Sequence, residues 1–446
     1  MKVLFLEVDT ERSWAVASIG PSFLAGALRS AGHEASFFRV TVDHDARDVL
    51  DVIAEERPGL IGVSMTTRQW LRGRDLVAAV KAVVNIPLIA GGLHPTFAPE
   101  GVLECPGFDF VCLGEGEGAL PDLVAALEGG RDGHGIANIW VRGGSRPPLR
   151  PPFAPIDGLP WLARDFLDEH YGLVHMATQR GCPFPCTYCA ARMYDELYEK
   201  AGDQYGRRRS VDSVLAELIQ LRDRRPSGAS RGPSQINYVI FLDDTFTIHH
   251  PWVREFCERY REEIGAPFCL HARVETVNPR LLEELASAGC RQITYGVESG
   301  SPRLRRDVMK RFATNERFEE VFRWTREQGI TVTANYMLGL PEETRDDLQM
   351  TLDLAERLDA YDFGYFVFYP YPGTQLFHHC QERGYLPSDW LHRPANHRQS
   401  ILTLPTLTPS DIAEYYDKFT DLRVRLHAAR GGGAATEHVI ASAECG

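Results

Sequence analysis

Residues 180–190 read RGCPFPCTYCA and directly follow an apolar stretch that predicts a strand. Cys182, Cys186 and Cys189 give this segment a C-x3-C-x2-C spacing. Spaced cysteine thiolates are the usual ligands of iron–sulfur clusters, and three of them fill three corners of a cubane. The prolines between the cysteines restrict the loop and so orient the sulfurs. We therefore expect these cysteines to bind a 4Fe–4S cluster, with one iron left open for a further ligand.

Two alternatives to a cluster are a zinc site and unrelated core thiols. Zinc normally takes four ligands in paired spacings, and His170 and His175 precede the loop without forming such a pair. Core thiols would not share a loop stiffened by proline. The other cysteines are scattered, as is typical of small core or surface residues: Cys105, Cys112, Cys257, Cys269, Cys290, Cys380 and Cys445.

The composition limits the kinds of partner. The chain has 446 residues and a net charge of −13, whereas a nucleic-acid surface needs concentrated Lys and Arg. The basic run Arg207–Arg209 is better explained as a solvated helix start. No apolar run reaches the ~18 residues of a membrane span, and the initial MKVLFLEVD predicts a buried strand rather than a signal peptide. We expect a cytoplasmic protein without disulfides that binds neither nucleic acid nor membranes.

Residues 1–140 alternate apolar runs with amphipathic stretches, which indicates a parallel sheet covered by helices. Strands at this spacing predict a flavodoxin-like, doubly wound α/β domain. The expected strands are Val3–Val8, Ala35–Val40, Leu60–Ser64, Pro87–Ala90 and Phe110–Leu113. The expected helices are Ser22–Ala31, Arg47–Glu56, Arg72–Val84 and Leu120–Leu127.

Proline and glycine are dense between residues 129 and 160, so we expect no regular structure there and a linker over residues 141–170. The β/α repeats of residues 171–375 suit an open, partial barrel. Residues 376–446 are expected to form a helical extension with a disordered tail from Ala428. The expected barrel strands are Leu173–Thr178, Asn237–Leu242, Phe268–Arg273, Gln292–Gly296, Thr331–Leu338 and Phe363–Phe368. The expected barrel helices are Val211–Arg222, Trp252–Ile264, Pro279–Ala288, Arg317–Gln328 and Arg345–Arg357.

The cysteine loop resembles the signature of the radical S-adenosylmethionine (SAM) enzymes at Cys182, Cys186, Tyr188 and Cys189. The resemblance extends over the following ~200 residues. It implies a partial (β/α)6 barrel whose cluster binds the amino and carboxylate groups of SAM at the open iron. One electron then cleaves SAM to a 5′-deoxyadenosyl radical, which abstracts a hydrogen atom. An external electron donor of the flavodoxin or ferredoxin type is implied as well.

Further positions that resemble this family suggest contacts to SAM. Asp243 and Asp244, in FLDDTF, are implied to accept hydrogen bonds from the amino group, although paired Asp at a strand end is equally typical of a helix cap. Arg273 is a candidate partner for the carboxylate. The remaining implied contacts are Tyr188 to adenine and Glu298 and Ser299, in YGVESGS, to ribose and carboxylate.

Residues 1–130 resemble the cobalamin-binding domain that precedes the barrel in one large class of radical SAM enzymes. The resemblance lies in the loops 9–21, 64–66 and 91–96 and in GEGE at 114–117. Residues 9–21 contain no histidine, so a bound cobalamin would lack the cobalt ligand of mutase-type domains. The alternative is a domain that keeps the fold with an empty pocket. The candidate cobalamin contacts are Ser64, Gly91, Gly92 and His94, the last through a ligand amide.

The order of the domains favours a cobalamin-dependent C-methyltransferase that acts on an unactivated C–H of a specialised metabolite, as in antibiotic biosynthesis. The alternative is radical 1,2-diol dehydration of an aminoglycoside, whose positive charge would suit an acidic protein. A non-enzymatic sensor is disfavoured by the intact cysteine loop. Glu115 and Glu117 are expected to bind backbone amides at the next helix. Tyr365, Tyr369 and His378 are candidates for the substrate pocket, with packing favoured for the two tyrosines.

Overall fold

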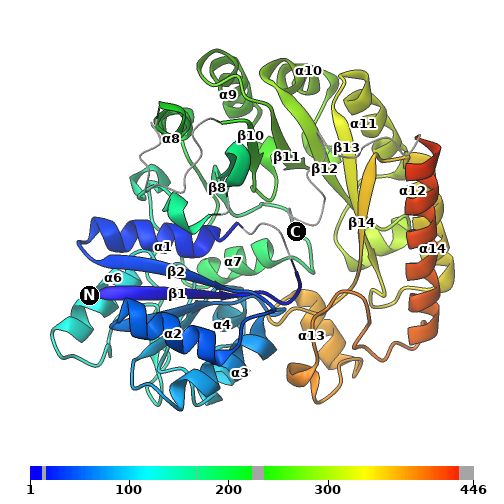
Figure 1. Ribbon diagram of the computed structural model, residues 1–446. Coiled ribbons are helices and arrows are strands. Elements are labelled where there is room, and N and C mark those ends of the chain that lie inside the picture. The colour runs from blue at the N-terminus through cyan, green and yellow to red at the C-terminus, as the bar shows by residue number, and fades with distance from the viewer. Residues whose placement is uncertain (13–16, 168, 224–235, 431–446) are drawn as a thin grey trace. The chain divides into compact units, whose positions relative to one another are not determined.

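The computed structural model describes residues 1–12, 17–167, 169–223 and 236–430 (Figure 1). The chain forms two compact units. The first comprises Met1–Asp168, Met193–Arg207 and His392–Ala395, and the second comprises Glu169–Arg192, Arg208–Leu391 and the chain from Asn396 onward. The first unit thus includes all but the last two residues of the expected linker, 141–170, and a stretch, 193–207, that lies within the predicted barrel sequence.

In the described residues of the first unit, the strands form one sheet in the order β2-β1-β3-β4-β5-β6. The first five strands are parallel, and the order 2-1-3-4-5 confirms the predicted flavodoxin-like fold. The last strand is antiparallel to β5, so the expectation of no regular structure after residue 129 was wrong there, because the apolar triplet IWV extends the sheet edge. The strands are β1 (Lys2–Val8), β2 (Glu34–Val40), β3 (Leu60–Ser64), β4 (Leu88–Gly91), β5 (Phe110–Cys112) and β6 (Ile139–Val141).

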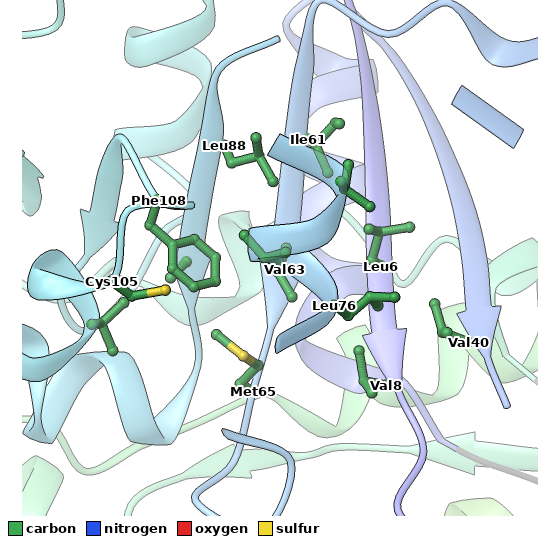
Figure 2. Packing of buried hydrophobic residues seen from close by; sticks show 14 of the residues in the cluster. Leu6, Val8, Val40, Ile61, Val63, Met65, Leu76, Leu88, Cys105 and Phe108 are labelled. Atoms are coloured by element: carbon green, nitrogen blue, oxygen red, sulfur yellow. The ribbon is translucent and has the colours of Figure 1, made fainter. Parts of the chain in front are cut away.

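Helices cover both faces of this sheet, because the strands are apolar on both sides. Leu4, Leu6 and Val8 of β1 pack into one core cluster, whereas Val3 and Phe5 pack into the cluster on the opposite face. Figure 2 shows the first cluster, in which side chains of β1, β2 and β3 meet those of the flanking helices and loops. The helices are α1 (Ile19–Ser30), α2 (Ala46–Glu56), α3 (Trp70–Lys81), α4 (Leu93–Phe97), α5 (Pro99–Glu104) and α6 (Ala119–Glu128), with short turns η1 (Ile156–Gly158) and η2 (Arg164–Phe166).

The second unit is built on a parallel sheet in the order β14-β13-β12-β11-β10-β7 over its described residues. Sequential parallel strands joined by helices confirm the predicted partial barrel, in which functional residues are expected at the carboxyl ends of the strands. The strands are β7 (Leu173–Met176), β10 (Tyr238–Phe241), β11 (Phe268–Ala272), β12 (Cys290–Glu298), β13 (Thr331–Leu338) and β14 (Asp362–Val367), besides the two-residue strands β8 (Gln179–Arg180) and β9 (Arg207–Arg208).

The barrel helices begin and end at residues that the sequence marks. For example, the Asn278 side chain caps the first turn before Pro279, and Gly289 ends that helix with a φ of +108°. The α-helices are α8 (Val211–Asp223), α9 (His250–Glu263), α10 (Pro279–Ala288), α11 (Asn315–Glu327), α12 (Arg345–Leu358), α13 (Gln375–Glu382) and α14 (Pro409–Ala429), preceded by α7 (Ala190–Glu199), of which residues 193–199 belong to the first unit. The shorter turns are η3 (His170–Gly172), η4 (Phe246–Ile248), η5 (Val274–Thr276), η6 (Leu304–Val308) and η7 (Trp390–His392).

The segment after the cysteine loop and the end of the chain were also subjects of prediction. Helix α7, which begins directly after Cys189, was not anticipated as a helix. The tail expected to be disordered falls almost wholly at residues 431–446, outside the described residues. Across the described helices, none combines the length and the apolar character needed to cross a bilayer.

Candidate active site

A buried carboxylate, that of Asp243, holds the segment that leads into the cysteine loop. Asp243 Oδ1 accepts hydrogen bonds from the backbone amides of Thr178, at 2.7 Å, and Gln179, at 2.8 Å, while Oδ2 accepts the Thr178 hydroxyl at 2.9 Å. Both carboxylate oxygens of Asp243 thus hold the chain that leads into the loop, and the expected bond to the SAM amino group stays a prediction. Asp244 is exposed beside it and remains the candidate for that contact.

The raised pKa of Asp243 predicts that the stability of the fold depends on pH. Burial raises the pKa of Asp243 to about 6, against the effect of its hydrogen bonds. Because the folded chain holds this proton more tightly, the contribution of Asp243 to stability falls as the pH rises from about 4 to about 6. We expect Asp243→Asn to remove this slope from the free energy of unfolding, measured by urea denaturation across that range. Identical pH profiles for wild type and variant would contradict the assignment.

The three cysteines lie together at the carboxyl end of β7. Cys182 and Cys186 are buried and Cys189 is half-buried. Burial raises the pKa of Cys182 and raises that of Cys189 to about 12, and the Asp244 carboxylate adds to both effects. No group of three or more His, Cys, Asp or Glu side chains in the described ranges is arranged to hold a single metal ion. The cluster assignment therefore depends on the motif and on the charges around the loop.

Two buried arginines supply positive charge to the loop. Arg273 Nη1 donates to Cys186 Sγ at 3.0 Å, and its guanidinium lies 3.8 Å from the centre of the Phe184 ring. Arg311 Nη1 lies 3.9 Å from the same sulfur and donates to the Tyr188 hydroxyl at 3.3 Å. Positive charge at this place suits a metal cluster held by anionic ligands. Arg273 was expected near this position, whereas Arg311 was missed because it is 125 residues from Cys186 in sequence.

Carboxylates complete this part of the site. Glu275 accepts a hydrogen bond from Arg273 at 2.7 Å, and it was also missed from the sequence. Glu298 ends β12 with a φ of +68° and lies 3.9 Å from Arg311. Burial raises the pKa of Glu298, while Arg311 lowers it. Burial likewise raises the pKa of Tyr188. The structure thus brings Tyr188, Arg273 and Glu298 together as expected.

Ser299 does not join this group. Its hydroxyl lies 3.2 Å from that of Thr351 on α12 and accepts the backbone amide of Ser301 at 3.2 Å. The side chain is fully buried. The hydroxyl thus contacts α12, and the expected SAM contact of Ser299 stays a prediction.

Unsatisfied buried atoms test whether SAM suits this site. Nε of Arg273 and Nε of Arg311 are buried without a hydrogen-bond partner, as is Oδ1 of Asn335 on β13. Gly364 lies next to Asn335, at a position where a side chain would collide with this oxygen. Buried donors and acceptors of this kind need partners. Guanidinium groups fit a carboxylate, and an amide fits a hydroxyl, so the residues present fit SAM.

The carboxyl edge of the first unit holds the expected cobalamin residues. Ser64, at the end of β3, pairs in register with Gly91 of β4 and with Glu7 of β1. Gly92 turns the chain with a φ of +98°, and a Cβ there would lie 2.8 Å from the Met65 carbonyl. Only glycine therefore allows this close approach of two loops.

His94 is buried behind this turn. Its ring stacks on Trp70 with centroids 4.7 Å apart, and Nδ1 lies 3.2 Å from the Thr67 hydroxyl. Burial lowers the pKa of His94 to about 3, so the ring is neutral. Nε2 is buried without a hydrogen-bond partner. A polar group of a ligand at this edge would satisfy that atom, which fits the predicted bond to a cobalamin amide.

Residues 193–207 pack against the β5–α6 loop within the first unit. The Glu115 amide donates to the Tyr198 hydroxyl at 2.9 Å, and both carboxylate oxygens of Glu115 accept from Arg207. The Phe153 amide also donates to this carboxylate, at 2.9 Å. Glu115 was expected to bind amides that begin α6, and the structure corrects this, since its partners come from distant parts of the sequence. Tyr198 stacks on Tyr205 with centroids 5.2 Å apart.

Three residues after β13 were candidates for the substrate pocket, and the structure shows the surroundings of each. The Tyr365 hydroxyl lies 2.8 Å from that of Thr420, and its ring packs against Phe419 of α14. Tyr369 is buried. These contacts and this burial fit the packing role favoured for both tyrosines from the sequence, which stays a prediction. His378 lies on α13, with its ring against Phe377.

Residues 176–355 match the radical SAM superfamily, and residues 15–124 match the B12 binding domain. A protein of Pyrococcus horikoshii named as an uncharacterized methyltransferase is 28% identical over 404 residues, which cover 85% of this chain and 83% of that protein. An anaerobic magnesium-protoporphyrin IX monomethyl ester cyclase of Rubrivivax gelatinosus is 25% identical over 405 residues, covering 84% and 69%. The radical SAM methyltransferase TsrM of Kitasatospora setae, solved with tryptophan and a SAM analogue, has a TM-score of 0.72 at 20% identity, covering 94% of this chain and 89% of that one. The last likeness shows a shared fold.

Proposed function

Because the chain belongs to the radical SAM superfamily and carries a B12-binding domain, we propose that it is a cobalamin-dependent C-methyltransferase acting on a small molecule. Two of the three relatives described above are named methyltransferases. The observation that carries the proposal is the meeting of Cys186 with Arg273 and Arg311 at the carboxyl edge of the barrel, in a chain whose other unit has the B12-binding fold.

When bound, the reduced cluster supplies the electron that cleaves SAM to a 5′-deoxyadenosyl radical, and cobalamin carries the methyl group. The chain holds and orients these groups. The thiolates of Cys182, Cys186 and Cys189 would hold the cluster, and coordination would keep them deprotonated despite their burial. Arg273 and Arg311 offset the resulting negative charge.

Other side chains orient SAM in this proposal. The carboxylates of Asp244 and Glu298 would bind its amino and ribose groups, an arginine would take its carboxylate in a charge-assisted hydrogen bond, and Tyr188 would contact adenine. In the first unit, the backbone at Ser64, Gly91 and Gly92 would hold the corrin, and His94 Nε2 would bind one of its amides.

The 1,2-diol dehydration expected as the alternative is not favoured, since the relatives above are named as methyltransferases and a cyclase. The substrate class proposed here is a specialised metabolite, such as an aminoglycoside intermediate. An external flavodoxin or ferredoxin is proposed as the electron donor.

Cobalamin retention tests the proposal. Protein purified anaerobically with hydroxocobalamin and reconstituted with iron and sulfide should hold about one corrinoid per chain, seen in its visible spectrum. With SAM and a strong reductant, it should form S-adenosylhomocysteine through methylation of the corrinoid, besides 5′-deoxyadenosine. Protein without cobalamin should form 5′-deoxyadenosine alone. Cluster-loaded protein that retains no corrinoid would point to dehydration or another cobalamin-free radical reaction.

A further inference from the structure

The cysteine loop is fastened to the barrel at one residue between two cluster cysteines. Thr187 is buried, and its hydroxyl donates to the Val308 carbonyl at 2.7 Å. Its backbone amide donates to the Met309 carbonyl at 3.4 Å, and its carbonyl accepts the Leu376 amide, at the start of α13, at 3.0 Å. The hydroxyl, the amide and the carbonyl of Thr187 therefore each have a protein partner.

The partner of Thr187 is an unusual turn. Residues Leu304–Val308 form a π-helical turn, which ends as the Met309 amide donates to the Leu304 carbonyl at 2.9 Å. Such turns are rare and are frequent at functional sites. The last carbonyls of any helix lack partners within it. Here, the amide and hydroxyl of Thr187 satisfy two of these carbonyls, so the cysteine loop caps the turn.

The π-helical turn is itself fixed to the segment proposed to bind SAM. Arg305 is fully buried, and its guanidinium donates to the Ser299 carbonyl. It also donates to Asn315 Oδ1 at 2.6 Å and to the Ala313 carbonyl at 3.2 Å. Burial lowers the pKa of Arg305 to about 10, which leaves it charged at neutral pH. The backbone after Glu298 and the turn are therefore tied together by one buried cation.

Arg311 follows the turn directly and reaches both residues beside Thr187. It lies 3.9 Å from Cys186 Sγ and donates to the Tyr188 hydroxyl at 3.3 Å. The π-helical turn thus holds the cysteine loop, through Thr187, and also positions the Arg311 guanidinium that faces this loop. A change at the Thr187 hydroxyl would alter the distance between them.

We propose that Thr187 is a positioning residue, which holds Cys186 and Tyr188 against Arg311 and Glu298 through the π-helical turn. It acts through its neighbours and touches neither SAM nor substrate. The inference depends on the proposed function only in that the cysteines hold a cluster at which SAM binds.

The test compares Thr187→Val, which keeps the shape and loses the hydroxyl donor, with Thr187→Ser, which keeps the donor. Each full-length protein is reconstituted anaerobically, and three quantities are measured: iron content, the electron paramagnetic resonance spectrum of the reduced cluster with and without SAM, and the KM for SAM in 5′-deoxyadenosine formation. We expect Thr187→Val to change the SAM-dependent spectrum and to raise this KM about five- to tenfold, the effect of one buried hydrogen bond. Thr187→Ser should match wild type.

Thr325→Val is the matched control, since Thr325 is fully buried, its hydroxyl donates to the Val321 carbonyl at 2.7 Å within α11 and lies 3.0 Å from the Tyr295 hydroxyl, and neither partner belongs to the cysteine loop or to the π-helical turn. This variant should keep the wild-type spectrum and KM. If Thr187→Val is insoluble, Thr187→Ala is compared with Thr187→Ser in its place. A wild-type spectrum and KM in the hydroxyl-free variant, or equal impairment in Thr187→Ser, would overturn the inference. A wild type that cleaves no SAM would instead overturn the proposed function.

Discussion

Cys186→Ala is expected to abolish cluster binding and SAM cleavage together. This sulfur is the one that both Arg273 and Arg311 approach, so its loss removes a ligand and leaves two buried cations without their shared negative partner. Reconstituted wild type should contain about four irons per chain and absorb broadly near ~400 nm. The variant should lose that absorption and form no 5′-deoxyadenosine. A loss of activity caused by oxygen and unrelated to the loop would not depend on this residue.

Cys257→Ala is the control for this experiment. Cys257 is buried on α9, away from the loop in sequence, and burial raises its pKa to about 12. It should therefore behave as a core thiol, and its variant should keep iron and SAM cleavage. A Cys186→Ala protein that retains wild-type iron and activity would refute the cluster assignment.

Glu115→Gln is expected to have the largest effect on stability. The Glu115 and Arg207 side chains are only 9% and 11% exposed, so their ion pair is buried. Removing one charge leaves Arg207 uncompensated in a poorly solvated place, which costs about 3 kcal/mol. Hydrogen exchange should report this loss as faster exchange of amides in residues 193–207 and in the β5–α6 loop.

The exposed ion pair between Arg150 and Asp122 provides the matched control in the same unit, since Asp122 is 54% exposed. Asp122→Asn should change stability by less than about 1 kcal/mol, because solvent screens exposed pairs. Equal effects of Glu115→Gln and Asp122→Asn would show that the buried pair does not anchor residues 193–207.

The parts of the fold that follow from local pattern could be predicted. Strand β13 and helix α10 have the bounds expected from their periodicity and end signals, and the cysteine loop is recognisable within eleven residues. What could not be predicted depends on contacts between distant residues. Asp243 and Ser299 were placed at the right strand ends, but their side chains are taken by Thr178 and Thr351, which no spacing reveals.

Arg311 illustrates the same limit within the site. Its role depends on a π-helical turn that returns the chain to the cysteine loop, and a single widened turn leaves no periodic signal in the sequence. The buried pair of Glu115 with Arg207 joins residues 92 positions apart. Such pairs need the folded backbone before they can be recognised.

The first unit is built from separate stretches of the chain, and this limits where chimeric proteins can be joined. A fragment that ends at Asp168 would lack Tyr198 and Arg207, and the Glu115 carboxylate would lose its cation. A chimera that takes this unit from a relative must therefore also take the residues equivalent to 193–207, which begin only four positions after Cys189. The two modules that the sequence presents in tandem are in this sense interlaced, and no single crossover separates them, because one after residue 207 also carries residues 169–192 of the second unit.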